Sequence, residues 1–286
     1  GPDVFLISNR DLPRTANKTV PAPADKMDLI KLRELFPTAV ESDFSGGGAV
    51  YALPLYLDTM ALLYNKDLLD QAAVVSPPKT WTEFQGVISK LRIISGTRQI
   101  TRAAVASRLR ISRSAIGGSE ATVDSAVDLV HLLILQNGNP MVDDRATHAT
   151  FAEESGLQAF DFYLQFADAG SRYYTWNDTQ PNSIDSFVEG KTAMILNYRA
   201  AVAAVKSRSP FLRLGVSEVP YASSDRAISY PRYMGLAVSR ASAEPAWAWD
   251  FAVYATTNLD AQRAYLETSG HPPALRSLIA EELGDP

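Results

Sequence analysis

The sequence predicts an α/β protein, because short apolar runs of strand length alternate along the chain with longer segments of helical periodicity. The strand candidates are residues 4–7, 61–64, 192–196, 214–219 and 236–238. A second observation is that glycines or prolines bound most of the helical segments, where caps and turns need them. We find no internal repeat and no low-complexity tract.

The segment 51–69 is an apolar run that Pro54 and Asp58 interrupt before it resumes at 61–64 and meets Asn65 and Asp67. This pattern predicts two short buried strands and the start of a helix. Asn65 or Asp67 is expected to accept hydrogen bonds from the first free helical amides. On the pattern alone, a crossover through the core explains the segment.

A helix is predicted to begin after the paired prolines Pro77 and Pro78, which stop any preceding helix. Thr80 and Glu83 have the spacing of a capping box, in which each side chain satisfies a free backbone amide of the first turn. This makes residue 80 a helix start.

The later helices are predicted from apolar faces of period 3.6. Gly138 ends the first and Gly170 the second, while residues 246–256 and 259–269 form a helical pair that Gly270 stops. The faces of the first two helices consist of Val123, Ala126, Val127, Val130, Leu133 and Ile134, and of Leu157, Phe160 and Leu164.

The bulk composition is that of an ordinary soluble protein, with 286 residues, 46% hydrophobic and 21% charged, and no apolar run of membrane-spanning length. The length allows one large domain or two lobes. A net charge of −5 and a pI near 5.3 argue against overall attraction to nucleic acid or anionic membranes. The absence of cysteine excludes a disulfide scaffold, a thiolate metal site and a cysteine nucleophile.

No motif for a metal, a phosphate or a nucleophilic serine is present. His131, His148 and His271 are far apart in sequence, and none belongs to a ligand pair. The glycine runs at 46–48 and 117–118 lack the spacing of a phosphate loop, and we expect turns there. The sequence therefore predicts no metal, no cofactor and no catalytic residue.

A set of motifs in a fixed order resembles the extracellular solute-binding proteins of carbohydrate ABC transporters (family 1, maltodextrin-binding-like) over nearly the whole chain. Tyr56 and His271 depart from that signature, where a small or short polar residue and an arginine are common, and they leave the ligand's identity open. The motifs are YALPLYLDTMALLYNKDLL at 51–69, PPKTWTEF at 77–84, LLILQNG at 132–138, MVDD at 141–144, YTWN at 174–177, DSFVEGKTAM at 185–194, GLAVS at 235–239 and TSGHPP at 268–273.

The resemblance implies a two-lobed periplasmic-binding-protein fold of type II-like topology with a hinge. Lobe 1 is expected to comprise residues 1–57 and 236–286, and lobe 2 residues 58–235. Lobe 1 would be incomplete at both termini, because family members begin with a further strand and helix and continue with further helices. Its parallel sheet would then lack an interior strand.

The resemblance further implies a substrate-binding component of an ABC importer that binds a sugar or oligosaccharide in an interlobe cleft and delivers it to the permease subunits. No reaction would be catalysed. The protein would be a monomer located outside the cytoplasm, either periplasmic or a cell-surface lipoprotein, with membrane contact only through a lipid anchor or the permease. The chain carries no export signal, and we expect the gene to encode one upstream of Gly1.

Sugar recognition needs aromatic faces that stack on pyranose C–H groups and planar polar side chains that hold hydroxyls. Ligands of open α/β sheets bind at the carboxyl ends of strands. Each aromatic candidate is either a stacking platform or packing, whereas Trp81, Trp247, Trp249 and Tyr64 are expected to be packing. The candidates at predicted strand and loop ends are Tyr56, Asp58, Trp176, Asn177, Asn197, Tyr198, Arg232 and Tyr233.

Two other function classes stay open. A carbohydrate-active enzyme on a related two-lobed scaffold would need two carboxylates across the sugar, for which Asp58, Asp178 and Asp185 are available. A nucleic-acid or regulatory module would use the basic stretch 90–113, although that stretch has no aromatic residue on which bases could stack. We expect a solvated face there and no nucleic-acid partner.

Overall fold

The computed structural model describes residues 1–97, 114–143, 147–222 and 227–284, with side chains left out at 92–97. The chain divides into two compact units, each with its own apolar core. Unit 1 comprises Gly1–Thr59 and Pro231–Pro286, and unit 2 comprises Met60–Tyr230. Most of the basic stretch at 90–113 lies outside the described residues.

Unit 1 is built on a four-stranded sheet in which β10 (Met234–Ser239) contacts all the other strands. β1 (Val4–Ser8) pairs with β10 along all five of its own residues, from Val4 opposite Val238 to Ser8 opposite Met234. β5 (Ala52–Pro54) and the short β2 (Thr19–Val20) also pair with β10. All three pairings are antiparallel, so the prediction of a parallel sheet is wrong.

The reason for that error is that apolar periodicity records which segments are strands but not the direction in which each enters the sheet. The alternation of strands with helices favoured parallel crossovers. In the structure, β10 belongs to the returning half of the chain and runs against β1, β2 and β5, which all precede unit 2.

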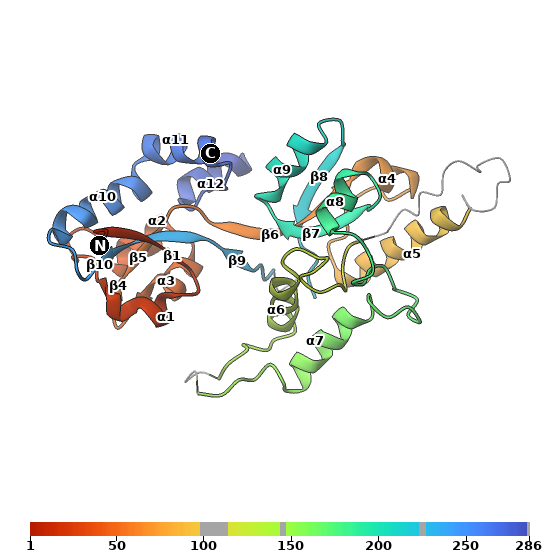
Figure 1. Ribbon diagram of the computed structural model, residues 1–286, viewed down its shortest axis with the longest axis horizontal. Helices are drawn as coiled ribbons and strands as arrows, with labels where there is room; N and C mark the ends of the chain where they lie inside the picture. Colours follow the sequence, from red (N-terminus) through yellow and green to blue (C-terminus); the bar gives the residue numbers. More distant parts are fainter. Residues whose placement is uncertain (98–113, 144–146, 223–226, 285–286) are drawn as a thin grey trace. The chain divides into compact units, whose positions relative to one another are not determined.

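Helices cover both faces of the unit 1 sheet. Figure 1 shows α10 to α12 on one side and α1 and α3 on the other. Trp249 of α10 and Phe44 of α3 are fully buried in the core between these layers. The helices of unit 1 are α1 (Leu12–Thr15), the 3-10 turn η1 (Ala16–Lys18), α2 (Leu29–Leu35), α3 (Thr38–Phe44), α10 (Pro245–Thr257), α11 (Leu259–Ser269) and α12 (Arg276–Leu283).

The α10–α11 pair confirms the prediction for 246–256 and 259–269. Asn258 separates the two helices and caps α11, because its side-chain oxygen accepts a hydrogen bond from the Ala261 amide at 3.0 Å. Gly270 ends α11 with φ 70°, a left-handed conformation that suits glycine. The predicted glycine turn is also present, since Gly47 and Gly48 have positive φ between β3 (Ser45–Gly46) and β4 (Ala49–Val50).

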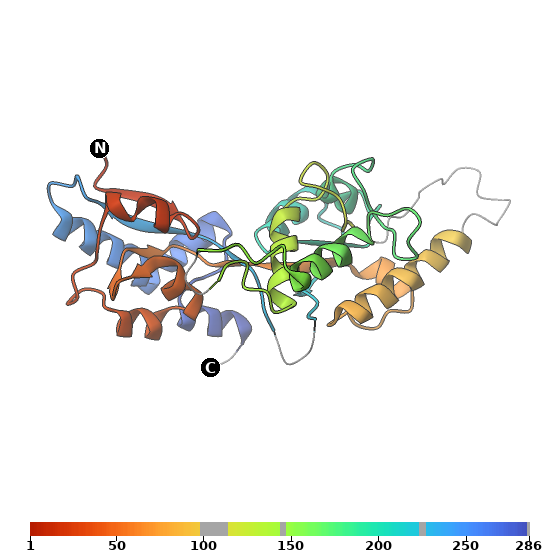
Figure 2. The same ribbon diagram turned by 90° about the horizontal axis from the view of Figure 1, so that it is seen from below.

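Unit 2 has a central strand, β6 (Asp58–Asn65), flanked by β7 (Met194–Tyr198) and β8 (Leu214–Glu218) in antiparallel pairing. β9 (Pro231–Arg232) pairs with the first two residues of β6. The helices are α4 (Lys66–Gln71), α5 (Trp81–Thr97), α6 (Ala126–Gln136), α7 (Glu154–Leu164), α8 (Ser183–Val188) and α9 (Ala201–Arg208). α6 and α7 lie side by side in both views (Figures 1 and 2).

The predicted helix starts of unit 2 are confirmed at atomic detail. Asn65 caps α4, since its Oδ1 accepts a hydrogen bond from the Leu68 amide at 3.2 Å. Thr80 Oγ1 accepts from the Glu83 amide at 3.2 Å, while Glu83 Oε2 accepts from the Lys79 amide at 2.7 Å. Among the described residues, none of these helices has the length and apolarity that a membrane span requires.

Candidate functional site

The predicted polar residues of unit 1 meet where β6 begins beside β9. Asp58 is the register partner of Arg232, so the two side chains belong to neighbouring strands. The Asp58 side chain is 3% exposed, whereas Arg232 is exposed. This brings a buried carboxylate and an exposed guanidinium to one strand pair.

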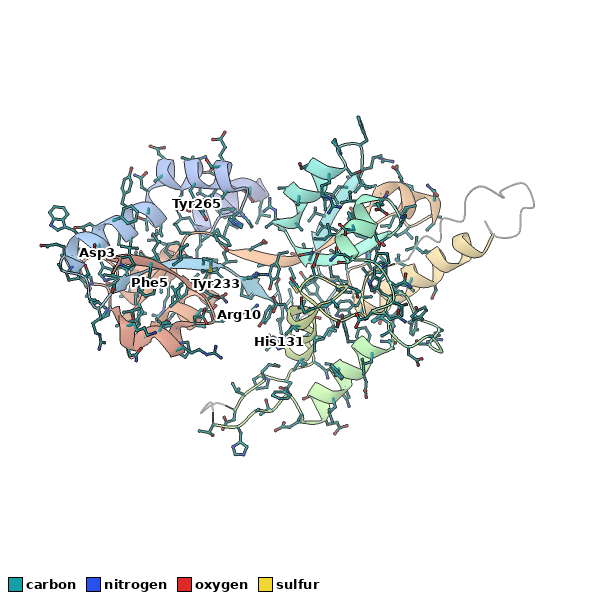
Figure 3. The ribbon with its side chains drawn as sticks, in the orientation of Figure 1. Asp3, Phe5, Arg10, His131, Tyr233 and Tyr265 are labelled. Carbon is teal, nitrogen blue, oxygen red and sulfur yellow. The ribbon has the colours of Figure 1, made fainter. Side chains whose placement is uncertain are left out.

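Tyr233 follows Arg232 but is held inside unit 1. Its ring is fully buried against the edge of Phe44, and its hydroxyl donates a hydrogen bond to Asp43 Oδ2 at 2.7 Å. Tyr233 is labelled in Figure 3. Asn9 Nδ2 donates to the same oxygen at 3.0 Å. Burial first, and then the Asp43 carboxylate, raises the pKa of Tyr233 well above its ordinary value. The phenol is therefore neutral and already engaged.

Tyr56 forms a stacked pair with His271. The ring centroids are 3.9 Å apart and the planes differ by 6°. Both side chains are half-buried. Burial is the main cause that raises the pKa of Tyr56; Tyr265 and Asp58 add to it, and Arg232 opposes it. Tyr56 thus has Asp58, Arg232 and Tyr265 in its electrostatic surroundings.

In unit 2, Asn197 and Tyr198 end strand β7 and are both buried. The Tyr198 hydroxyl donates to Asp128 Oδ2 of α6 at 2.7 Å. Asn197 Oδ1 accepts a hydrogen bond from the Tyr198 amide at 2.7 Å. The bond to Asp128 fixes the end of β7 against α6, and the two contacts engage the Tyr198 hydroxyl proton and Asn197 Oδ1.

Trp176 packs in the core of unit 2, where its side chain is 1% exposed. A side chain on Gly118 would press against its ring, since a Cβ there would lie 3.1 Å from the Trp176 ring. Its indole nitrogen has no hydrogen-bond partner among the described residues. Asn177 is half-buried, and its Oδ1 accepts hydrogen bonds from the Thr179 amide at 3.1 Å and hydroxyl at 2.6 Å.

The structure therefore groups the eight candidates into a unit 1 set, with Tyr56, Asp58 and Arg232 near one another, and a unit 2 set. Within unit 2, Asn197 and Tyr198 are neighbours on β7, and Trp176 and Asn177 are neighbours in a loop.

Of the carboxylates that an enzyme would need, two are already engaged in contacts at the surface. Asp178 accepts hydrogen bonds from the Ser119 amide at 2.7 Å and the Thr122 hydroxyl at 2.9 Å, and these bonds lower its pKa. A glycosidase acid needs the opposite shift. Asp185 forms an exposed ion pair with Arg208 at 2.8 Å. Within the described residues, no group of three or more acids and histidines could hold a metal ion.

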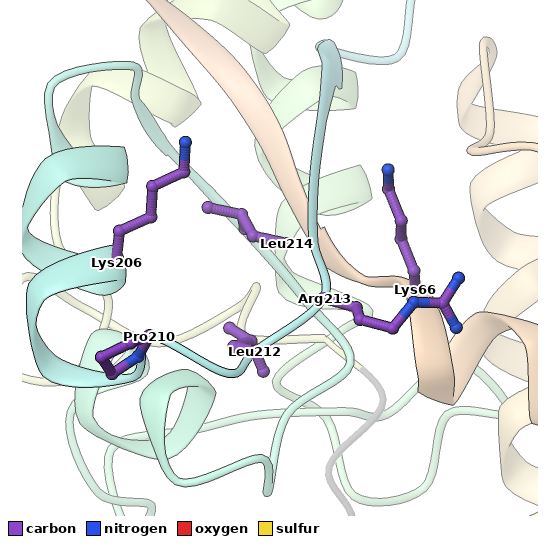
Figure 4. A pocket seen from close by; sticks show the side chains of 6 residues that line it. All are labelled: Lys66, Lys206, Pro210, Leu212, Arg213 and Leu214. Carbon is purple, nitrogen blue, oxygen red and sulfur yellow. The ribbon is translucent and has the colours of Figure 1, made fainter.

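A surface depression of about 420 Å³ lies in unit 2 and includes none of the eight candidates. In Figure 4 the Lys66 and Lys206 side chains extend in the same direction on either side of Leu214. Arg213 is bound to Asp67 at 2.7 Å and to Asp70 at 3.2 Å. The lining residues are Lys66, Lys206, Pro210, Leu212, Arg213 and Leu214.

Sequence reasoning missed three partners of the candidate residues. The sequence marks His271 as no metal ligand and as a departure from the family signature, but it does not indicate that Tyr56 is its partner. Asp128 lies on the apolar face of α6, where a single acid signals a buried partner. Asp43 carries no such signal, because it lies in a polar stretch before the glycine turn.

Comparison with known proteins identifies the family and the fold of this chain. A family described as bacterial extracellular solute-binding protein matches residues 1–283. The maltotriose-binding protein of Pyrococcus abyssi is 22% identical over 290 residues, which cover 100% of this chain and 56% of that protein. A putative binding protein of Brucella abortus is 22% identical over 178 residues, 60% of this chain and 38% of its own length. The chain thus spans well under two thirds of these curated relatives.

Solved structures share the fold at low identity. The sugar-binding protein MalE of Xanthomonas citri has a TM-score of 0.77 at 21% identity, with 97% of this chain and 67% of that chain covered. UgpB of Mycobacterium tuberculosis, solved with glycerophosphocholine, has a TM-score of 0.74 at 17% identity over 97% of this chain and 66% of its own. At such identity the likeness establishes the arrangement of the backbone.

Proposed function

The chain belongs to the bacterial extracellular solute-binding protein family, and from that premise we propose that it is the substrate-binding component of an ABC importer. In this proposal it binds a sugar or oligosaccharide and delivers it to the permease. The observation that carries the proposal is the family match over residues 1–283, which takes in both units. The two-lobed α/β fold and the family, both predicted from sequence, are confirmed.

A carbohydrate is the solute that the comparisons support best. Relatives with this fold were solved with tagatose, with maltose and with acarbose, and the Pyrococcus relative is a maltotriose-binding protein. The relative that binds glycerophosphocholine shows that the fold also serves a polar solute that is not a sugar. The choice of sugar for this chain therefore rests on its aromatic and planar polar residues as well.

Direct contact with a sugar is proposed first for the residues that keep exposed surface. These are Tyr56, Arg232 and Asn177. Tyr56 offers a ring face, and Arg232 and Asn177 offer planar hydrogen-bonding groups. The other five, Asp58, Trp176, Asn197, Tyr198 and Tyr233, are buried, and their roles as ligand contacts stay predictions that depend on local rearrangement.

The members of the family are binding proteins, and for this chain we propose that no reaction is catalysed. The lowered pKa of Asp178 and the ion pair of Asp185 support that proposal, because neither carboxyl is prepared to act as a general acid. The extracellular family assigns the protein to the outside of the cytoplasm. A periplasmic or lipid-anchored state, a monomer, a permease partner and no nucleic-acid partner are parts of the proposal.

Isothermal titration calorimetry with a panel of mono- and oligosaccharides tests this function. The panel should include glycerophosphocholine, peptides, polyamines and divalent metals as competing solute classes. At least one sugar is expected to bind, and binding restricted to the other classes would show the sugar assignment to be wrong. Turnover of a chromogenic glycoside that is lost in Asp58→Asn or Asp178→Asn would favour an enzyme instead.

A further inference from the structure

The stacked rings of Tyr56 and His271 are fixed by the backbone on both sides. The amide of Leu57 donates a hydrogen bond to the carbonyl of Pro272 at 3.3 Å, which ties the residues after each ring together. Pro272 and Pro273 are buried and have restricted backbones. The two rings are therefore attached to segments that have little freedom to separate.

The turn before His271 adds to this rigidity. Gly270 ends α11 in the left-handed conformation, and its amide donates to the Leu266 carbonyl at 2.8 Å. The His271 amide donates to Ser269 Oγ at 3.3 Å. The direction in which the imidazole leaves the chain is thus set by the end of a helix.

The imidazole of His271 makes no hydrogen bond through its buried nitrogen to any described residue. Its Nδ1 is inaccessible to solvent and has no hydrogen-bond partner among the described residues. What the ring does make is a parallel contact with Tyr56 at 3.9 Å.

We propose that His271 is a positioning residue for carbohydrate binding: it covers one face of Tyr56 and presents the opposite face to a pyranose ring. This rests on the proposed function. Aromatic rings bind the apolar C–H face of a sugar, and a ring already held in one orientation loses less conformational entropy on binding. His271 thereby selects solutes with a flat apolar face.

The neighbours of Tyr56 fit the same role. Asp58, Arg232 and Tyr265 all lie near enough to influence its hydroxyl. A sugar stacked on the Tyr56 ring would find these hydrogen-bonding groups beside it. Tyr265 is labelled in Figure 3 on α11, the helix whose end leads into His271.

The test is a double-mutant cycle by calorimetry on the sugar that the wild-type protein binds, with His271→Ala, Tyr56→Ala and the double variant. His271→Ala is expected to weaken affinity roughly three- to tenfold, which is the range for losing the pre-ordering of one side chain. In the Tyr56→Ala background the same change should have no further effect. His271→Phe restores a stacking ring without the ring nitrogens and should keep affinity near that of wild type. His148→Ala, at an exposed histidine of unit 2, is the matched control.

The melting temperatures of all variants distinguish a role of His271 in positioning Tyr56 from a role in stability alone. A His271→Ala protein that melts earlier but binds with unchanged affinity would overturn the inference and leave the proposed function standing. Equal losses from His271→Ala with and without Tyr56 would also overturn it. If the wild-type protein binds no sugar at all, the proposed function fails, and this role of His271 fails with it.

Discussion

The hydroxyl of Tyr198 donates a hydrogen bond to Asp128 Oδ2 at 2.7 Å although both side chains are buried, with 5% and 6% of their surfaces exposed. The bond joins the end of β7 to the first turn of α6, which are 70 residues apart in the chain. A buried carboxylate needs such donors, because removing its hydration is costly. The end of β7 is therefore positioned by a polar contact as well as by packing.

Tyr198→Phe is expected to lower the free energy of unfolding by about 1–3 kcal/mol, because it removes a donor from a buried charged acceptor. Urea denaturation measures the change. Tyr64→Phe is the control, since Tyr64 lies in β6 of the same sheet and its hydroxyl has no hydrogen bond among the described residues. Equal losses in the two variants would show that the bond to Asp128 contributes little.

Trp176→Ala is expected to lower the free energy of unfolding by about 3–5 kcal/mol, because it leaves a large cavity in the core of unit 2. Thermal melting and calorimetry on the same variant separate this cost from any loss of sugar affinity. Trp247→Ala is the matched control, since Trp247 is 72% exposed and should change stability by less than about 0.5 kcal/mol. A loss of affinity in Trp176→Ala with no loss of stability would favour a stacking platform over packing.

Much of the fold was predictable where the local pattern decides the outcome. The α11 boundaries, the Asn65 cap and the capping box at Thr80 all depend on neighbours within a few residues, and the structure has them as predicted. The two-residue strands β2 and β9 were not predicted, because so short a segment shows no periodicity and becomes a strand only through its partner.

The candidate site was less predictable for the same reason. Tyr198 and Tyr233 each follow or end a strand next to a polar residue, which is the local pattern of a ligand contact. Their hydroxyls donate hydrogen bonds to Asp128 and Asp43, which lie 70 and 190 residues away in the chain. A sequence shows that a tyrosine has a polar tip, but the fold determines which partner reaches it.

Gly235→Ala is expected to destabilise the protein by about 1–3 kcal/mol through overpacking. A Cβ at this position would lie 2.5 Å from the Phe44 ring and 2.7 Å from the Leu53 carbonyl oxygen, and a backbone atom cannot move aside cheaply. Gly86→Ala in α5 is the contrasting change, because nothing lies within 4 Å of a Cβ there. Gly86→Ala should raise the free energy of unfolding by about 0.5–1 kcal/mol through helix propensity. Chemical denaturation of both variants measures the two changes.

Protonation of Asp178 is expected to lower the stability of the protein in acid. Its hydrogen bonds from Ser119 and Thr122 lower its pKa below the ordinary value of 3.8. A lowered folded-state pKa means that its stabilising contribution is complete above 3.8 and is lost as the pH falls below that value through the folded pKa. Urea denaturation of wild type and Asp178→Asn across this range should give a difference that shrinks towards low pH. Asp161→Asn, at an exposed aspartate of α7, is the control; a pH-independent difference for Asp178→Asn would contradict the expectation.

Arg232→Ala is expected to weaken sugar binding roughly 10- to 100-fold. Arg232 is exposed on β9 beside Asp58, so its loss opens no cavity, whereas a charged hydrogen bond to a hydroxyl contributes about 1.5–3 kcal/mol. Arg232→Lys keeps the charge but not the planar pair of donors. Its sugar affinity should lie between those of wild type and Arg232→Ala. Arg240→Ala, at an exposed arginine just after β10, should bind like wild type. If calorimetry finds Arg232→Ala as tight as Arg240→Ala, Arg232 does not contact the sugar, because the loss of a ligand's charged partner cannot be silent in binding.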